Sequence, residues 1–172
     1  MNLIGQKAKK ASFEKVNTKI KNKILKRYAL LLDKERSSII TANTKDIKFA
    51  LKKGLKNNLI DRLTINHKKL DNIKNSINKI TKLKDPVDNT LEKWSRPNGL
   101  RIKRVSIPIG VIGVIYESRP NVTSDVASLC FKSGNAVILK GGSEAVNTNK
   151  ILAKLFRKAL KENKVNENFI QF

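Results

Sequence analysis

Apolar residues recur at helical spacing in the first half of the chain. From about residue 5 to residue 84 they return every three or four positions, as Ile20 and Ile24 do. This spacing places apolar side chains on one face of each helix, so the pattern predicts an N-terminal layer of helices. Thr41–Asn43 offers a capping group for one of these helices, and Asn66 offers one for the last of them.

The period changes over residues 87–106, where a strand or hairpin arm is expected. Leu100 and Ile102 alternate with basic residues, which is the period of a strand. Arg96–Gly99, just before them, is a strong turn signal. We expect Trp94 to be a packing anchor at the joint between the helical part and the sheet.

Two short apolar runs, Gly110–Ile115 and Ala136–Leu139, are each followed by a polar turn and then by a helical pattern. This order predicts a βαβ unit, which builds a parallel sheet, and Phe169–Phe172 would add a third strand. One residue of Thr123–Asp125 would cap the first crossover helix. The expected fold class is α/β, with an N-terminal helical layer followed by the first half of a Rossmann-like parallel sheet.

The same patterns divide the chain into three parts. We expect a helical segment over residues 1–86, a strand arm or connection over 87–107, and a partial dinucleotide-binding βαβαβ unit over 108–172. A parallel sheet that stops on a strand leaves an apolar face uncovered. We therefore expect the chain to be truncated, a fragment of a longer protein.

Polar segments follow the first two strands, at the edge where parallel sheets bind ligands. The first segment carries an arginine that can clamp a carboxylate or phosphate and an asparagine that can donate to an oxyanion. The second pairs a lysine with two glycines, which let a ligand approach the backbone near a helix N-terminus. An ordinary turn remains the alternative for each segment, and neither standard glycine-rich nucleotide fingerprint applies. The candidates are Tyr116, Glu117, Ser118, Arg119 and Asn121 after the first strand, and Lys140, Gly141, Gly142, Ser143 and Glu144 after the second.

The chain is strongly basic, but the distribution of its charge does not favour a nucleic-acid partner. The 172 residues include 37 basic and 14 acidic side chains, a formal net charge of +23. Such a charge attracts nucleic acid, so a basic non-catalytic nucleic-acid-binding module is one alternative. The lysines, however, are spread over nearly every helical segment, which is typical of a solvated surface. We expect no nucleic-acid partner.

The single cysteine, Cys130, excludes an internal disulfide and lies mid-helix between two apolar residues. A nucleophilic thiol needs a basic partner or a helix N-terminus, so we expect a buried structural thiol instead. No spacing of metal ligands is present. The sequence also lacks an apolar run long enough to span a bilayer and a signal peptide, so we expect a cytoplasmic protein without a membrane partner.

Several longer segments are similar to one known family. They run from Trp94 to Ile102, from Pro108 to Thr123 and from Lys132 to Ala145, with Ala42–Ile47 and Leu59–Thr64 upstream. Together they resemble the gamma-glutamyl phosphate reductases, also called glutamate-5-semialdehyde dehydrogenases, of the aldehyde dehydrogenase superfamily. The resemblance covers essentially the whole chain, and the segment from Tyr116 to Thr123 is specific to this family within the superfamily.

The resemblance implies a reaction of proline biosynthesis, in which NADPH reduces L-glutamyl 5-phosphate to L-glutamate 5-semialdehyde and phosphate is released. It implies that the nucleophilic cysteine, which forms a thioester that takes the hydride, belongs to a catalytic domain beyond residue 172. This chain would then hold no catalytic residue and would be inactive by itself. Another aldehyde dehydrogenase, acting on free aldehydes, remains an alternative.

The resemblance also implies roles for the site residues. Lys140 matches the lysine that contacts the adenosine ribose, whereas Glu144 lies one residue later than the glutamate of the commoner pattern. Lys140 and Ser143 together would hold a 2′-phosphate, which agrees with NADP(H) as cofactor. The contact with the oxyanion or substrate falls on Arg119 or Asn121, depending on the alignment, with Ser118 as a further candidate.

Three partners follow from the resemblance. The first is L-glutamyl 5-phosphate, a small-molecule substrate. The second is another copy of the chain, because we expect a homo-oligomer. The third is a functional link to glutamate 5-kinase.

Overall fold

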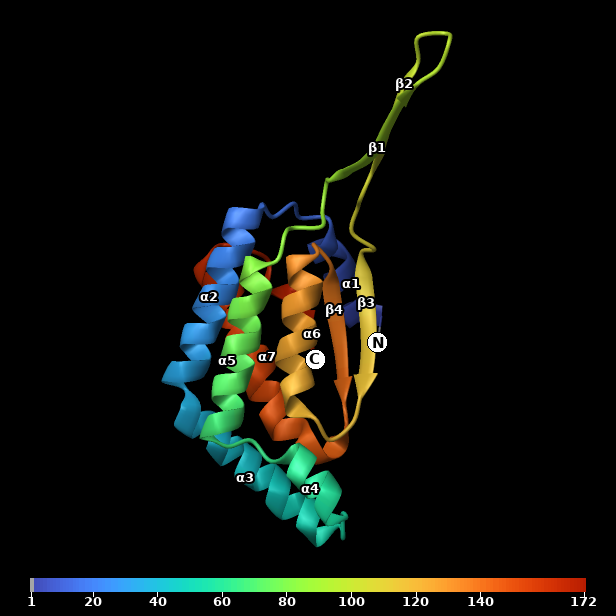
Figure 1. Ribbon diagram of the computed structural model, residues 1–172. Coiled ribbons are helices and arrows are strands. Elements are labelled where there is room, and N and C mark those ends of the chain that lie inside the picture. The colour runs from blue at the N-terminus through green and yellow to red at the C-terminus, as the bar shows by residue number, and fades with distance from the viewer. Residues whose placement is uncertain (1) are drawn as a thin grey trace.

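Seven helices and five strands make up residues 2–172, the part of the chain that the computed structural model describes (Figure 1). The helices are α1 (Asn2–Ser12), α2 (Thr18–Lys34), α3 (Arg36–Lys52), α4 (Asn57–Leu63), α5 (His67–Lys82), α6 (Pro120–Lys132) and α7 (Val146–Glu162). The strands are β1 (Thr90–Ser95), β2 (Arg101–Val105), β3 (Val111–Tyr116), β4 (Ala136–Gly141) and β5 (Ile170–Gln171), and the 3-10 turns are η1 (Ser143–Ala145) and η2 (Glu167–Phe169). None of the helices in this range is both long and apolar enough to cross a bilayer.

The parallel sheet has the order β3-β4-β5, with α6 and α7 as the crossover helices. Strands β3 and β4 pair in parallel from Val111 opposite Ala136 to Tyr116 opposite Gly141. The α/β class and the βαβαβ order expected from the sequence are therefore confirmed. Because the strands are parallel and in register, the carboxyl ends of β3 and β4 meet at one edge of the sheet.

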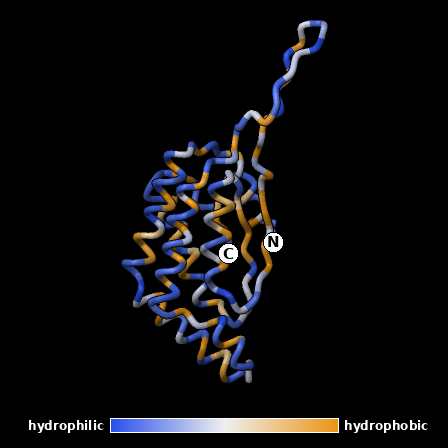
Figure 2. The backbone as a smooth tube through the Cα atoms, in the orientation of Figure 1, coloured by the Kyte–Doolittle hydropathy of each residue, from blue (hydrophilic) through white to orange (hydrophobic). Residues whose placement is uncertain are grey.

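One continuous apolar core joins the helical layer to the sheet. Hydrophobic positions recur along the helices and dominate β3 and β4 (Figure 2). Tyr28 of α2 stacks on Phe156 of α7, with 4.5 Å between the ring centroids. Phe131 of α6 packs edge-on against both Phe156 and Phe169. These large buried side chains join α2 to the crossover helices and to the turn η2 that precedes β5.

Two expected helix starts are wrong, and in each case the helix begins earlier than the capping residues suggest. Thr41–Asn43 lies inside α3. Asn43 is tolerated there because its buried side chain donates to the carbonyl of Leu63 and accepts from the backbone N–H of Ile65. Helix α6 begins at Pro120, whose ring fixes a helical φ and whose missing N–H costs nothing at the first position. The expected cap at Asn66 is confirmed, since its side chain accepts from the N–H of Lys69.

Strands β1 and β2 form an antiparallel hairpin that projects from the body of the molecule (Figure 1). Its tip is the expected turn, which Gly99 closes at a φ of +81°. The expectation that Trp94 anchors the arm to the body is wrong, because Trp94 lies on the projecting hairpin and is 39% exposed. Most of its neighbours on the arm are exposed as well, and its cross-strand partner is Ile102 of the same hairpin.

A buried carboxylate ties the helical layer to the start of α7. Asp46 of α3 is 1% exposed and accepts from the backbone N–H groups of Asn147 and Thr148, at 3.1 and 2.7 Å. It also accepts from the Asn147 amide at 2.8 Å and the Thr148 hydroxyl at 2.6 Å. Helix N-termini leave such N–H groups unpaired and favour a nearby negative charge. Asp46 therefore caps a helix that begins about a hundred residues later in the chain.

Replacing Asp46 with alanine is expected to lower the free energy of unfolding by about 3 kcal/mol or more, because buried donors at the start of α7 would lose their acceptor. Chemical denaturation of wild type and variant measures this loss. The control is Asp61→Ala, which removes an exposed carboxylate and should change the free energy by less than about 0.5 kcal/mol. Equal effects of the two substitutions would contradict the capping role of Asp46.

Candidate functional site

A cleft of about 590 Å³ lies at the carboxyl edge of β3 and β4. It brings together six of the residues singled out in the sequence, two at the end of β3 and four consecutive residues at the end of β4 and just beyond it. Its lining consists of Ile115, Tyr116, Glu117, Leu139, Lys140, Gly141, Gly142, Ser143, Val146, Lys150 and Phe172. The parallel register of the two strands places these segments side by side, as expected for a ligand site of an open α/β sheet.

The two glycines of the turn after β4 are required by the protein's own packing. A Cβ on Gly141 would overlap the side-chain nitrogen of Asn149, and one on Gly142 would overlap the carboxylate of Glu144. Asn149 in turn accepts a hydrogen bond from the hydroxyl of Thr123 at 2.9 Å, and Thr123 bonds the hydroxyl of Tyr116 at 2.6 Å. The glycines thus let α7 pack close to the strand ends, while leaving their backbone at the wall of the cleft.

Glu144 joins the two turns that border the cleft. Its Oε1 accepts from the backbone N–H of Ser118 at 2.7 Å and from the Ser118 hydroxyl at 3.0 Å. Ser118 has a φ of +39°, a strained conformation that these bonds hold in place. Burial raises the pKa of Glu144, but the backbone and side-chain hydrogen bonds outweigh it, so the pKa lies below its usual value.

The N-terminus of α7 has fewer free backbone N–H groups for an anion than the sequence suggests. Asp46 already accepts from the N–H groups of Asn147 and Thr148, so these two donors are taken. The positive groups left at the cleft are the ammoniums of Lys140 and Lys150. Within residues 2–172 neither of them forms an ion pair. An anionic ligand in this cleft would meet lysine side chains and not a free helix end.

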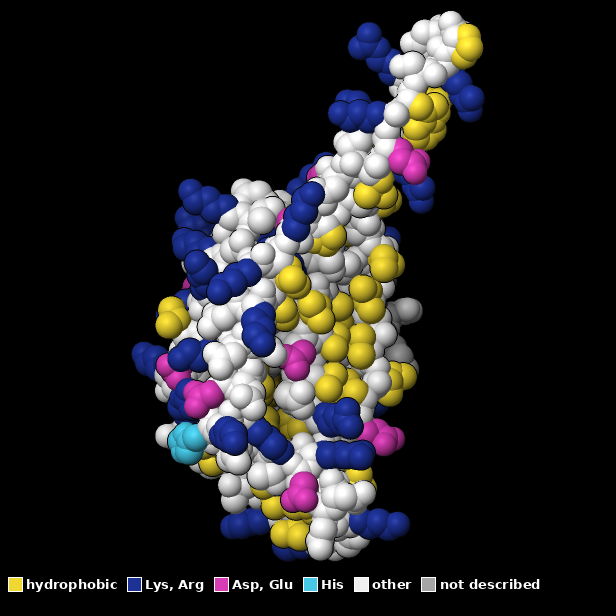
Figure 3. All heavy atoms as spheres, in the orientation of Figure 1, with side chains coloured by type: hydrophobic (Ala, Val, Ile, Leu, Met, Phe, Trp, Pro, Cys, Tyr) yellow, Lys and Arg dark blue, Asp and Glu magenta, His cyan; other side chains and the backbone are white. Residues whose placement is uncertain are grey.

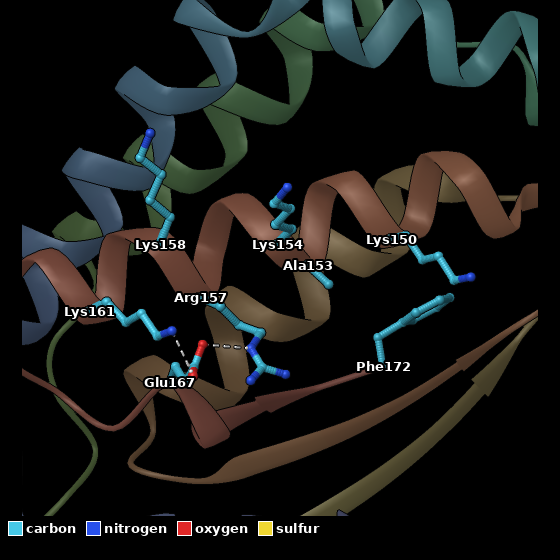
Figure 4. Close-up of a pocket in the computed structure, with 8 residues that line it drawn as sticks. All are labelled: Lys150, Ala153, Lys154, Arg157, Lys158, Lys161, Glu167 and Phe172. Atoms are coloured by element: carbon cyan, nitrogen blue, oxygen red, sulfur yellow. Dashed lines mark hydrogen bonds and ion pairs between the residues drawn. The ribbon is translucent and has the colours of Figure 1, made fainter.

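A basic hollow of about 560 Å³ continues from the cleft along α7 (Figure 4). Lys150 and Phe172 line both spaces. Figure 4 shows Arg157 and Lys161 turned toward Glu167, with which they form ion pairs at 3.1 and 2.9 Å. The side chain of Lys150 extends beside the ring of Phe172. The positive charge near the cleft is therefore concentrated on one face of α7.

The three candidates for contact with the oxyanion or substrate lie in different environments. Ser118 is buried and engaged with Glu144. Arg119 is exposed at the N-cap position of α6, where its side chain forms no capping bond. Asn121 faces α5 and donates to Asp125 at 3.2 Å. None of the three lines the cleft, so their roles stay predictions.

Cys130 is buried, at 7% exposed, as expected for a structural thiol. Burial raises its pKa to about 11. A thiol with such a pKa is almost entirely protonated at neutral pH and is a poor nucleophile. Within residues 2–172, no cluster of three histidine, cysteine or acidic side chains is arranged to hold a metal ion.

Several residues of the site were not predicted from the sequence. Val146 and Lys150 line the cleft from one face of α7, and their spacing of four is a signal that could have placed them there. Phe172 was expected only as part of a strand. Asp46, which caps α7, carries no local signal, because its partners lie about a hundred residues away in the sequence.

Glu144→Gln keeps the shape of the side chain and removes its charge. At pH 7 it should lower the free energy of unfolding by about 1 kcal/mol, since charge-assisted bonds exceed neutral ones. A carboxylate with a lowered folded pKa stabilises above its unfolded pKa, and this stability is lost as pH falls through the folded pKa. The difference between wild type and variant should therefore shrink as the pH falls below the usual range of a glutamate, as followed by denaturation at several pH values.

The matched control is Glu117→Gln, which removes the charge of an exposed glutamate at the same edge. It reports the general effect of charge on a very basic chain. A difference for Glu144→Gln that is constant between pH 7 and pH 3, or equal to that of the control, would contradict the role of Glu144 in joining the two turns.

Comparison with known proteins identifies relatives of this chain over nearly its whole length, although no family model matches it. The gamma-glutamyl phosphate reductase of Persephonella marina is 47% identical over 158 residues, which are 92% of this chain and 36% of that protein. That of Thermotoga maritima is 42% identical over 177 residues, covering 100% of this chain and 43% of the relative. The chain thus spans about two fifths of the length of these relatives.

Solved structures agree with the sequence relatives. The crystal structure of gamma-glutamyl phosphate reductase from Thermotoga maritima matches with a TM-score of 0.95 at 42% identity, over 98% of this chain and 41% of that one. The corresponding protein from Saccharomyces cerevisiae matches at 0.91 and 32% identity, over 98% of this chain and 45% of that one. A putative aldehyde dehydrogenase from Bacillus subtilis, at 0.65 and 20% identity over 92% of this chain and 33% of that one, shares the fold. Over nearly its whole length the chain is therefore homologous to the N-terminal part of the gamma-glutamyl phosphate reductases.

Proposed function

We propose that this chain is the N-terminal part of a whole protein that reduces L-glutamyl 5-phosphate to L-glutamate 5-semialdehyde with NADPH in proline biosynthesis. In this reaction a hydride is transferred to the acyl carbon, the bond from that carbon to the phosphate oxygen breaks, and inorganic phosphate leaves. The observation that carries the proposal is the 41–48% identity to proteins named gamma-glutamyl phosphate reductase along nearly the whole chain.

The cleft fits the adenosine end of a nicotinamide cofactor. Gly141 and Gly142 present backbone at its wall, and the hydroxyl of Ser143 and the ammonium of Lys140 lie on the same turn. Lys140 is exposed and forms no ion pair within residues 2–172, so its charge is available to a 2′-phosphate. When bound, the cofactor supplies the hydride. Tyr116 and Glu117 also line the cleft, where they would orient the cofactor.

The turn after β3 is proposed to meet the substrate. The guanidinium of Arg119 is exposed and has the bidentate geometry that suits a phosphate or carboxylate. Ser118 is held by Glu144, so the turn that carries Arg119 is fixed relative to the cleft. Asn121 lies in the first turn of α6, from which its amide can donate to a developing oxyanion.

Long-range electrostatics favour the same ligands. The formal net charge is +23, and Lys150, Lys154 and Lys158 add positive charge along α7 beside the cleft. An acyl phosphate and NADPH are both polyanions, and a positive field raises their encounter rate. Over the face shown in Figure 3 the basic side chains are scattered among helices and arm, which supports a solvated surface over a nucleic-acid site.

The whole protein is proposed to act in the cytoplasm as a homo-oligomer. The projecting hairpin supports association, because Leu91, Trp94 and Leu100 are exposed on it and would gain burial against another copy. The substrate is an acyl phosphate, so a kinase that phosphorylates the side chain of glutamate must supply it. We therefore propose glutamate 5-kinase as the functional partner.

The test of the proposed function is NADPH oxidation by the whole protein with L-glutamyl 5-phosphate. We expect turnover that depends on the acyl phosphate, which separates this reaction from that of other aldehyde dehydrogenases. The 172-residue chain alone should show none above a no-protein control, because its single cysteine is buried with a raised pKa. Activity of the chain alone, or acyl-phosphate-independent activity of the whole protein, would refute the proposal.

Cys130→Ala in the whole protein tests whether this cysteine is the nucleophile. It should leave turnover largely intact, since Cys130 is buried in α6 away from the cleft. Its cost should be one of packing, about 1 kcal/mol of stability. A folded variant that has lost turnover by several orders of magnitude would show that Cys130 is the nucleophile.

Lys140→Ala in the whole protein should weaken the binding of NADPH more than that of NADH. A charge-assisted contact with the 2′-phosphate is worth roughly 1.5–3 kcal/mol, or about ten- to a hundredfold in affinity. Dissociation constants for both cofactors give the ratio directly. Lys93→Ala on the exposed hairpin arm is the control and should leave the ratio unchanged. If the ratio of the two dissociation constants is unchanged in Lys140→Ala, Lys140 does not contact the 2′-phosphate.

A further inference from the structure

A separate pocket of about 270 Å³ lies between α5, α6 and the connection from α4 to α5. Arg62, Ile65 and Lys69 line it from one side, and Asn121 and Asp125 from the other. Helices α5 and α6 both start at the end of the molecule toward which β3 and β4 point (Figure 1). The pocket therefore opens at the same edge as the cofactor cleft, on the other side of the turn that carries Ser118 and Arg119.

The carboxylate of Asp125, which lines this pocket, lacks a full set of hydrogen-bond donors. Asp125 receives one hydrogen bond, from the amide of Asn121 to its Oδ2 at 3.2 Å. Its Oδ1 is buried and has no partner among residues 2–172. A buried acceptor without a donor is costly, and a carboxylate oxygen is costlier still. Burial raises the pKa of Asp125, and the bond from Asn121 opposes this only in part. A cationic donor in the pocket would remove the penalty.

The positive side is incompletely paired as well. Arg62 forms no ion pair with any residue from 2 to 172. The ammonium of Lys69 donates to the backbone carbonyls of Asp61 and Thr64, which fix its position but do not neutralise its charge. The pocket thus presents two cations and one carboxylate that lack charged partners. Phosphate would match only the cations, and a polyamine only the carboxylate.

We infer that this pocket binds the α-ammonium and α-carboxylate of the glutamyl substrate, an inference that rests on the proposed function. The ammonium contacts Asp125, and the carboxylate contacts Arg62 and Lys69. Ile65 and Ile73 supply an apolar wall for the methylene chain. Asn121 lines the pocket and follows the turn that carries Arg119, so a substrate seated here directs its γ-carbonyl toward that turn.

The pocket is built entirely from residues of this chain, so binding is tested on the chain itself. The ¹⁵N-labelled chain is titrated with L-glutamate 5-methyl ester, which keeps both head-group charges and has an uncharged γ-end. We expect saturable shifts of the amide signals of residues 62–76 and 121–125. Arg62→Gln and Asp125→Asn should each raise the dissociation constant about tenfold or more. Lys68→Gln, an exposed charge next to Lys69 but outside the pocket, should leave it unchanged.

Two analogues assign each charge to its partner. Monomethyl glutarate lacks the ammonium, so its affinity should be insensitive to Asp125→Asn. Methyl 4-aminobutanoate lacks the carboxylate, so its affinity should be insensitive to Arg62→Gln. If one variant misfolds, as its amide spectrum would show, the other variant with its own analogue still decides the assignment.

Absence of shifts in these segments at saturating ester, or an equal loss of affinity in Lys68→Gln, would overturn the inference. Sensitivity of both analogues to both variants would overturn the assignment of the two charges. Reductase activity of the whole protein is measured separately. An active reductase with no binding in this pocket refutes only the present inference, whereas binding here without reductase activity refutes only the proposed reaction.

Discussion

The arrangement of the candidate site depends on one buried carboxylate, that of Asp46. It accepts four hydrogen bonds from Asn147 and Thr148 and so fixes the start of α7 to α3. The contacts that shape the cleft then follow from α7 and the turn before it. Asn149 packs against Gly141, and Glu144 holds Ser118. Because Asp46 fills the helix end that an anionic ligand would otherwise use, the cleft must attract anions with lysine side chains.

The sequence was sufficient where local periodicity decides the structure. The spacing of apolar residues predicted the helices, and the order of runs around Gly110–Ile115 and Ala136–Leu139 predicted the parallel sheet and its ligand edge. The predicted helix start at Thr41–Asn43 was wrong because a distant contact overrides the local preference. Asn43 caps no helix and instead forms hydrogen bonds with the backbone of Leu63 and Ile65 within the core. The prediction for Trp94 was wrong for a different reason, since a large apolar side chain suggests burial in the body of the molecule but Trp94 lies on the projecting arm.

The turn after β3 separates two chemically different spaces. On one side lies the cleft with Lys140 and Lys150, which suits the phosphates of a cofactor. On the other lies the pocket of Arg62, Lys69 and Asp125, which suits an amino-acid head group. The sequence predicted the edge of the sheet that lines the cleft, but not the pocket, which combines residues from helices far apart in the chain. The proposed reaction would use both spaces, and the proposed division assigns each space one reactant.

A crystal structure of the whole protein with NADP⁺ bound tests the central claim, that the carboxyl edge of β3 and β4 is the cofactor site. We expect the adenosine ribose against the Gly141–Gly142 backbone, with the 2′-phosphate within hydrogen-bonding distance of the Lys140 ammonium. We also expect that Asp46 keeps its bonds to Asn147 and Thr148 in that complex. A ribose bound away from residues 140–143, or a phosphate that displaces Asp46 at the start of α7, would contradict this claim.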